Sequence, residues 1–320
     1  MKIMAYAIAL ALAALLQTAG AEPYPSKPVR LVVGAGVNST SGTAARVIAD
    51  PLSAMWKQRV MVENRPEGGG VPATALVAKA TPDGYTLLLC SLASHGYSRV
   101  LWNTLPYDPL NDFAPVSRIG GVPNGLVVHP SLPVTSVKGF IAFANANPGE
   151  LTYSGRTGSS PQITMEWFRS VTRTKVTYVP WMRGHPTAGE VVAGRVMVAF
   201  QNVPEFLALV REGKLRALAV TSTKRTPQLP GTPTLIESGL SGFEVTVWGG
   251  LCAPKGVAKP IIAKLNADVA KVLSMPEVRK RYAAQGGEIA TSTPEEFADF
   301  IKAENAKWAK AVKAAGIKPM

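Results

Sequence analysis

The sequence is poor in the residues that build metal centres and nucleophilic active sites. It holds two cysteines and three histidines among 320 residues, and His95, His129 and His185 are isolated from one another. No cluster of these residues has the spacing of metal ligands. The sequence also lacks a Gly-x-Ser-x-Gly elbow, a Walker loop and a His-Glu-x-x-His pair. We therefore expect no metal, no cofactor and no catalytic residues.

The two cysteines are too few and too far apart to indicate a disulfide framework. Cys90 and Cys252 each belong to an apolar run typical of a strand. A buried free thiol is common in such a run, whereas an oxidising compartment would allow the two to pair. The apolar surroundings favour two unpaired thiols, with pairing as the alternative.

The first 21 residues have the pattern of a secretory signal peptide. Lys2 supplies a cationic start, an apolar run covers residues 3–16, and Ala19 and Ala21 are the small residues that signal peptidase requires. The run is shorter than the roughly 20 residues that span a bilayer, which argues against a membrane anchor. We expect cleavage after Ala21 and export to the periplasm.

The charge balance is basic. Without residues 1–21 the chain keeps all but one of its 34 Lys and Arg against 21 Asp and Glu, a net charge of about +12. A nucleic-acid protein would gather these cations into a patch or an arm, but here they are spread singly among acids, as at Lys138, Arg169, Arg195, Lys214 and Lys264. We infer solubility and attraction for anions, with no nucleic-acid partner.

Strand-like and helix-like segments alternate along the chain. Short β-branched runs, such as residues 29–33, 85–89 and 126–128, are separated by helical periods. About 299 residues remain after signal cleavage, which exceeds one comfortable core. The pattern predicts an α/β protein of two domains with mostly parallel sheets. Thr293 and Pro294 open the last helix with a cap and a first-turn proline.

The loop after the first strand has two interpretations. Its sequence, Gly34-Ala35-Gly36-Val37-Asn38-Ser39, resembles a dinucleotide fingerprint with serine in place of the third glycine, and Glu63 could bind the ribose. The same loop is also dense in hydroxyl groups and leads into a helix, where backbone N–H groups favour an anion. The second interpretation needs fewer assumptions.

This donor-rich chemistry recurs at three junctions between a strand and a helix. The junctions are residues 38–42, 91–96 and 154–161. Each alone is more simply explained as an N-cap and a turn. Open α/β sheets bind ligands at strand ends, however, so the repetition predicts a carboxylate site.

Several stretches of the sequence together identify a family. They include Tyr24-Pro25-Ser26-Lys27-Pro28, Val62-Glu63-Asn64-Arg65-Pro66, Ala80-Thr81-Pro82-Asp83-Gly84-Tyr85-Thr86 and Gly213-Lys214-Leu215-Arg216-Ala217-Leu218-Ala219-Val220. From Tyr24 to the C-terminus the chain resembles the Bug family of periplasmic solute-binding proteins, the receptors of tripartite tricarboxylate transporters.

The resemblance implies an α/β, two-domain periplasmic-binding-protein fold (type II, Venus-flytrap) with two crossover strands, near residues 119–126 and 245–253. Domain 1 would comprise residues 22–123 and 247–320, and domain 2 residues 124–246. By position, the family's ligand-binding segments correspond here to Val37, Asn38, Ser39, Thr40, Ser41, Ser91, His95, Ser154, Arg156, Thr157, Ser159, Gln162, Trp181, Arg183, His185, Gln201, Asn202 and Trp248.

Departures from the family pattern indicate the ligand. The first loop lacks the family's aspartate, while Arg156, Arg183 and His185 add positive charge to the predicted cleft. Arginine forks match carboxylates, so we expect a ligand without an amino group. Trp181 and Trp248, unless they serve domain packing, would offer flat walls for an aromatic mono- or dicarboxylate.

These features predict a monomeric receptor that captures a small carboxylate and delivers it to the membrane permease of a tripartite tricarboxylate transporter. One alternative is an exported hydrolase-like enzyme, which would need Ser39, Ser91 or Ser159 to contact His95 or His185. The other is a periplasmic ligand sensor of the same fold.

Overall fold

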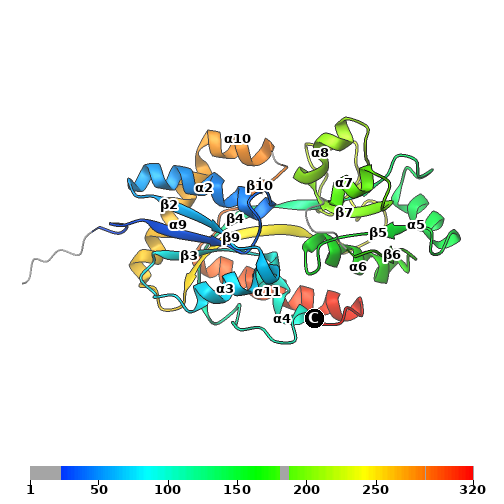
Figure 1. The fold of residues 1–320 in the computed structure, drawn as a ribbon. Coiled ribbons are helices and arrows are strands. Elements are labelled where there is room, and N and C mark those ends of the chain that lie inside the picture. Colours follow the sequence, from blue (N-terminus) through cyan, green and yellow to red (C-terminus); the bar gives the residue numbers. More distant parts are fainter. Residues whose placement is uncertain (1–22, 181–186, 285, 320) are drawn as a thin grey trace, which may run out of the picture.

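The protein consists of two lobes joined by long strands (Figure 1). This computed structural model describes residues 23–180, 187–284 and 286–319. The expected signal peptide, residues 1–21, lies outside the described residues. Within the described ranges, no helix has both the length and the apolarity needed to cross a membrane.

The elements alternate as the sequence predicts. The first part of the chain forms β1 (Val29–Val33), α2 (Thr40–Trp56), β2 (Val60–Asn64), the 3-10 turn η2 (Glu67–Gly70), α3 (Val71–Ala78), β3 (Thr86–Ser91), the π-helical turn η3 (Leu92–Gly96), α4 (Ser98–Leu101) and β4 (Phe113–Val128). Then follow α5 (Val137–Ala146), β5 (Thr152–Tyr153), α6 (Ser160–Thr172), β6 (Thr177–Tyr178), α7 (Thr187–Val192), β7 (Val198–Asn202), α8 (Val203–Arg211) and β8 (Arg216–Val220). The last elements are β9 (Thr246–Pro254), α9 (Lys259–Ser274), α10 (Pro276–Ala284), β10 (Glu288–Ile289) and α11 (Pro294–Ala314).

The strands follow the order β2-β1-β3-β9-β4-β7-β5-β6, with β8 and β10 also pairing with β4. Strand β1 is parallel to β2 and β3, and β5 is parallel to β6 and β7. Strands β4 and β9 run antiparallel to their neighbours. The two parallel groups lie in different lobes, one on either side of the β4–β9 pair (Figure 1).

Strand β4 passes from one lobe into the other. Its first part pairs with β9 as far as Pro123, and its second part pairs with β7 from Asn124 onward. Strand β9 begins at Thr246, opposite Pro123. The expected crossovers coincide with these segments, and we propose the boundaries between domains at residues 123–124 and 246–247.

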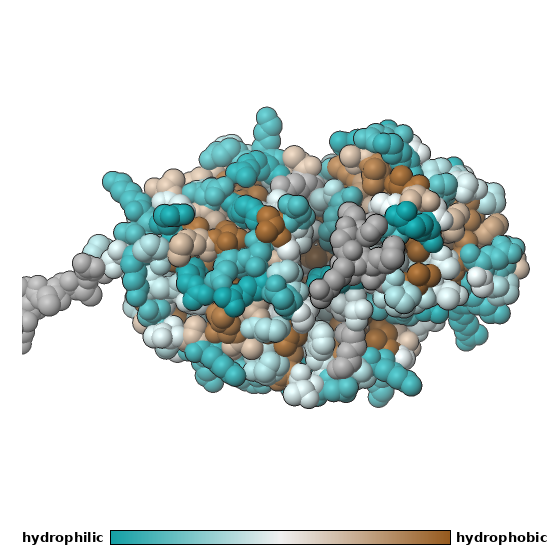
Figure 2. All heavy atoms as spheres, in the orientation of Figure 1, coloured by the Kyte–Doolittle hydropathy of each residue, from teal (hydrophilic) through white to brown (hydrophobic). Residues whose placement is uncertain are grey.

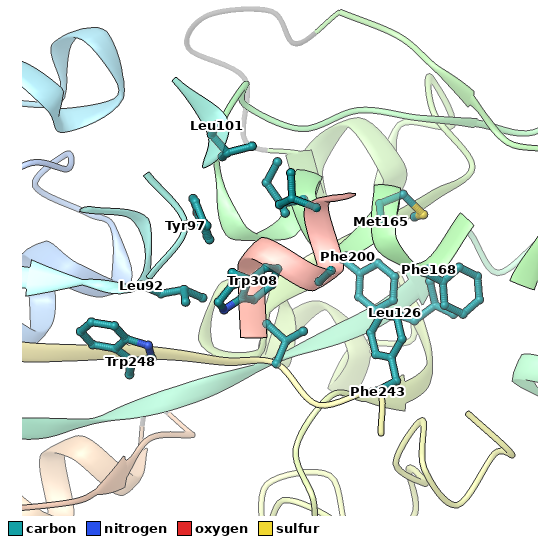
Figure 3. Packing of buried hydrophobic residues seen from close by; sticks show 14 of the residues in the cluster. Leu92, Tyr97, Leu101, Leu126, Met165, Phe168, Phe200, Phe243, Trp248 and Trp308 are labelled. Carbon is teal, nitrogen blue, oxygen red and sulfur yellow. The ribbon is translucent and has the colours of Figure 1, made fainter. Parts of the chain in front are cut away.

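A continuous core extends under both lobes. Figure 3 shows Trp248 and Trp308 near Leu92 and Tyr97, with Phe168, Phe200 and Phe243 farther along the cluster. Further clusters lie between the sheet and α2 and α9 in the first lobe, and beneath α7 and α8 in the second. By contrast, mainly polar side chains with scattered hydrophobic ones cover the face seen in Figure 2.

The last helix, α11, begins as its sequence predicts. The Thr293 hydroxyl accepts a hydrogen bond from the Glu296 N–H at 3.1 Å, and the Glu296 carboxylate accepts one from the Thr293 N–H at 2.9 Å. This reciprocal capping box satisfies two backbone donors that would otherwise lack partners. Helix α11 then packs its apolar face against β4 and η3.

The expectation of two unpaired thiols was wrong, because Cys90 and Cys252 form a disulfide with their Cα atoms 5.9 Å apart. Strands β3 and β9 are antiparallel neighbours in which Leu88 lies opposite Cys252 and Cys90 lies opposite Gly250. The two cysteines are therefore diagonal neighbours on one face of the sheet, within bonding reach. Their sequence separation of 162 residues hid this proximity.

Candidate functional site

A cavity of about 750 Å³ lies between the two lobes. The first lobe contributes Gly34, Ala35, Gly36, Asn38, Ser39, Thr40, Ser41, Gly69, Leu89, Ser91, Ala93, Tyr97 and Val247. The second lobe contributes Gly155, Arg156, Ser159, Ser160, Pro161, Thr187, Ala188, Gln201, Asn202 and Glu205. The volume suits a small organic molecule enclosed by both lobes.

The carboxyl ends of strands from both parallel groups lie beside the cavity. Strands β1 and β3 end beside it in the first lobe, and β5 and β7 end beside it in the second. The loops after β1, β3 and β5 are the donor-rich segments of the sequence, whereas β7 leads directly into α8. Because parallel strands end at the same sheet edge, loops far apart in the chain face one another here.

Three helices also begin at the cavity. The N-cap of α2 is Ser39, whose hydroxyl accepts a hydrogen bond from the Gly42 N–H at 3.0 Å. Helix α6 begins after Ser159, and α8 begins after Asn202. Free N–H groups and the helix dipole make each beginning positive. The first turns of α2 and α6 contain no acidic residue, whereas that of α8 contains Glu205.

Two charged side chains of opposite sign line the cavity. Arg156 is half-buried in the loop after β5, whereas Glu205 lines the cavity as an exposed residue. The protein atoms that surround the Glu205 carboxylate raise its pKa above the ordinary value, although hydrogen bonds from Asn202 and Thr40 and the charge of Arg156 oppose this. The walls therefore combine positive helix ends and a guanidinium with one acid.

Hydrogen bonds connect the lobes across the cavity. The Asn202 Nδ2 donates to Thr40 Oγ1 at 3.0 Å and to Glu205 Oε1 at 2.6 Å. Asn124 of β4 donates to Asn202 Oδ1 at 2.7 Å, and the Thr164 hydroxyl donates to Asn124 Oδ1 at 2.9 Å. This chain of bonds orients the Asn202 amide, because each neighbour determines which end donates.

Half of the residues expected from the sequence line the cavity. They are Asn38, Ser39, Thr40, Ser41, Ser91, Arg156, Ser159, Gln201 and Asn202. Trp181, Arg183 and His185 lie outside the described residues.

Four others lie beside the cavity lining rather than in it. Val37 is 55% exposed, and Thr157 is also exposed. Ser154 is buried, and the Gln162 side chain accepts a hydrogen bond from the Gly158 N–H at 2.8 Å. Gln162 therefore shapes the loop that carries Arg156.

His95 and Trp248 are buried in the core, so the expectation that they face the cleft needs correction. His95 packs against Phe113 with ring centroids 4.6 Å apart, and burial lowers its pKa to about 3. Trp248 is 1% exposed and donates its indole N–H to Glu304 at 2.9 Å. A histidine and a tryptophan in these positions contribute core packing.

Glu205 is a charged lining residue that the sequence reasoning missed, as it also missed Tyr97, Ser160 and Thr187. That reasoning held that the cleft had lost its carboxylates, and the structure places one in the wall. The segment Asn202-Val203-Pro204-Glu205 has the pattern of a helix start, with a cap, a proline and an early acid. Since this start follows a strand directly, the pattern could have identified Glu205 as a neighbour of the site.

The two enzyme-like interpretations find no support in the geometry. Within the described residues, Ser39, Ser91 and Ser159 make no hydrogen bond to a histidine. The serine that lies 2.9 Å from a histidine nitrogen is Ser94, next to the buried ring of His95. No group of three described His, Cys, Asp or Glu residues could hold a metal ion. Glu63, the possible ribose ligand, is paired with Arg30 and Arg65 at 2.7 and 2.5 Å. Its carboxylate is engaged outside the cavity.

Comparison with known proteins agrees with this geometry. Residues 44–317 match the sequence profile of TctC, the tripartite tricarboxylate transporter family receptor. Protein BugT of Bordetella pertussis is 34% identical over 313 residues, which cover 97% of this chain and 96% of BugT.

Solved structures show the same architecture. Rpa4515 of R. palustris, solved with adipate, has a TM-score of 0.87 and 36% identity, covering 93% of this chain and all of that one (100%). MatC (Rpa3494) of Rhodopseudomonas palustris, with bound malate, has a TM-score of 0.81 and 30% identity, covering 90% and 100%. These likenesses confirm the expected α/β periplasmic-binding-protein fold. The chain therefore belongs to the TctC family of tripartite tricarboxylate transporter receptors, the Bug-type periplasmic proteins that bind solutes and are not enzymes.

Proposed function

We propose that the protein captures a small carboxylate in the cavity between its lobes and delivers it to the permease of a tripartite tricarboxylate transporter. The observation that carries this proposal is the meeting of three helix N-termini and Arg156 at one cavity. Free N–H groups at helix ends and a guanidinium are the donors that a carboxylate prefers.

The ligand would be held from both sides. Residues 38–41 and Ser91 would contact it from the first lobe, and Arg156, Ser159, Gln201 and Asn202 from the second. A ligand that touches both lobes stabilises the closed arrangement through contacts that the open one lacks. The closed monomer is then the form that a permease would recognise in the periplasm, after removal of residues 1–21.

Two kinds of acid are candidates for the ligand. The similar proteins with adipate and malate support an aliphatic dicarboxylate. The preference for an aromatic mono- or dicarboxylate now depends on Trp181, because Trp248 is buried. Both kinds fit the cavity volume, and we retain the aromatic preference as the hypothesis to test.

A thermal-shift screen tests the proposal on the mature protein, residues 22–320. The panel contains adipate, hexanoate, malate, terephthalate, benzoate, aspartate and glutamate, with adipamide and benzamide as uncharged controls. A ligand that binds the folded form raises the melting temperature, and titration calorimetry then ranks the affinities. Equal stabilisation by the amides would contradict carboxylate recognition. Tight aspartate or glutamate binding without a response to the other acids would contradict the ligand class.

Delivery is tested separately by uptake of the best ligand into cells. Deletion of the gene should abolish uptake, and a chromosomal copy should restore it. Normal uptake accompanied by a lost transcriptional response to the ligand would instead indicate the sensor role.

A further inference from the structure

Glu205 brings a negative charge to the cavity wall beside Thr40 and Asn202. Its Oε1 accepts hydrogen bonds from Asn202 at 2.6 Å and from Thr40 at 3.3 Å. Thr40 is the first residue of α2, so the Glu205 carboxylate lies beside the helix beginning that we propose for a ligand carboxylate. The other oxygen, Oε2, makes no hydrogen bond to a described residue and is available to a ligand.

Few charged or titratable groups surround Glu205 among the described residues of the cavity. Arg156, on the loop after β5, is the charged group whose field acts on Glu205. Tyr97, directly after η3, is the remaining titratable residue among the described residues that line the cavity. The lining residues of α2, α7 and β9 carry no titratable side chain. Burial raises the pKa of Tyr97 well above its usual range, so this phenol stays neutral.

Ionised Glu205 offsets the positive charge of Arg156 at the cavity. Each helix N-terminus contributes roughly +0.5, so the beginnings of α2, α6 and α8 together offer roughly +1.5. Arg156 adds one positive charge and ionised Glu205 removes one. Among the described residues the two side-chain charges cancel, so the helix beginnings are the positive groups left to face a ligand.

We propose that Glu205 is a specificity-determining residue of this cavity: it permits binding of a singly charged carboxylate and makes binding of a doubly charged one depend on the uptake of a proton. The inference rests on the proposed function, since it concerns the charge of the same ligand. The proton would reside on Glu205 or on the ligand, because two carboxylates in contact cannot both remain ionised at low cost. The raised pKa of Glu205 is consistent with this role.

The substitution Glu205→Gln removes the negative charge of the side chain and nearly conserves its shape. Glutamine keeps an oxygen that can accept the bonds from Asn202 and Thr40, and replaces Oε2 with an NH₂ group. The matched control is Glu150→Gln, which removes one negative charge from an exposed position of the same lobe. Circular dichroism verifies the fold of both variants.

Titration calorimetry compares acids of similar shape that differ by one carboxylate: adipate with hexanoate, and terephthalate with benzoate. At about pH 8, Glu205→Gln should raise the affinity for the dicarboxylate relative to the monocarboxylate on the order of tenfold. Titrations at about pH 7 are repeated in phosphate and in Tris. The difference between the binding enthalpies in the two buffers gives the number of protons taken up on binding. Wild type should take up about one proton with the dicarboxylate, and Glu205→Gln should take up almost none.

The outcomes separate the two proposals. An unchanged affinity ratio and equal proton uptake in wild type and Glu205→Gln would overturn the inference and leave carboxylate capture intact. An equally large change in Glu150→Gln would also overturn it, because net charge rather than the cavity would then be responsible. If no acid of the panel binds wild type or variant, the proposed function and this inference fall together.

Discussion

The amide of Asn202 donates a hydrogen bond to the hydroxyl of Thr40 at 3.0 Å, joining the second lobe to the first. The two residues are 162 positions apart in the chain, and both line the cavity. Their contact is a direct link between the lobes. Such a link would favour the closed arrangement that we propose a ligand stabilises.

Substitution Thr40→Val removes this link while conserving side-chain shape. The loss of a hydrogen bond worth about 0.5–1.5 kcal/mol should weaken ligand binding roughly 2- to 10-fold and widen the ligand-free protein in small-angle scattering. Thr43→Val, one turn further along α2, is the control because the Thr43 side chain does not line the cavity. Equal effects of the two substitutions would contradict a specific role for Thr40.

Substitution Thr164→Val tests the buried chain of hydrogen bonds behind Asn202. Thr164 is fully buried and its hydroxyl donates to Asn124. Without the Thr164 hydroxyl, the buried Asn124 Oδ1 loses this hydrogen bond, which should lower the free energy of unfolding by about 1–3 kcal/mol. Urea denaturation measures the change, and the exposed Thr223→Val should alter it by less than about 0.5 kcal/mol. A loss no larger than that of the control would count against the network.

Substitution Arg156→Gln should weaken carboxylate binding about 10- to 100-fold, because a charged hydrogen bond contributes about 1.5–3 kcal/mol. Calorimetry with the best acid of the screen measures the effect. Arg211→Gln removes a cation from the exposed end of α8 and should leave affinity nearly unchanged. Similar losses in both variants would mean that overall charge, rather than Arg156, attracts the ligand.

Replacing Cys90 and Cys252 together with alanine should lower the free energy of unfolding by about 2–4 kcal/mol. The disulfide closes a long stretch of chain, so its loss enlarges the unfolded ensemble. Thiol titration of denatured, unreduced protein should detect no free thiol. Two titratable thiols in periplasmic material would show that the bond does not form.

The stability of the ligand-free protein should depend on pH through Glu205. The folded protein raises the pKa of this carboxyl above its ordinary value of 4.5, so the folded state holds the proton more tightly than the unfolded state. The contribution of Glu205 to stability is therefore most favourable in acid and declines as pH rises through the raised pKa. We therefore expect the free energy of unfolding of Glu205→Gln to increase relative to that of wild type as the pH rises from about 4.5 to about 8. A difference that does not change with pH would contradict the raised pKa.

Residue types in the sequence predicted part of the candidate site. The donor-rich loops predicted an anion site, and Ser39, Thr40 and Arg156 do line the cavity. His95 belongs to the same kind of loop, yet the π-helical turn η3 places its ring beside Phe113. Composition predicts which segments surround a site, whereas the direction of each side chain depends on the local backbone.

The sequence by itself determined the features that depend on near neighbours. The helix start at Thr293 and the alternation of strands and helices follow from capping, proline position and hydrophobic period, which act over a few residues. The tertiary structure alone decided that Cys90 bonds to Cys252, that Trp248 is buried, and that Glu205 meets Thr40 across 165 residues. These contacts depend on strand order and on how the lobes face each other, and no local pattern encodes either.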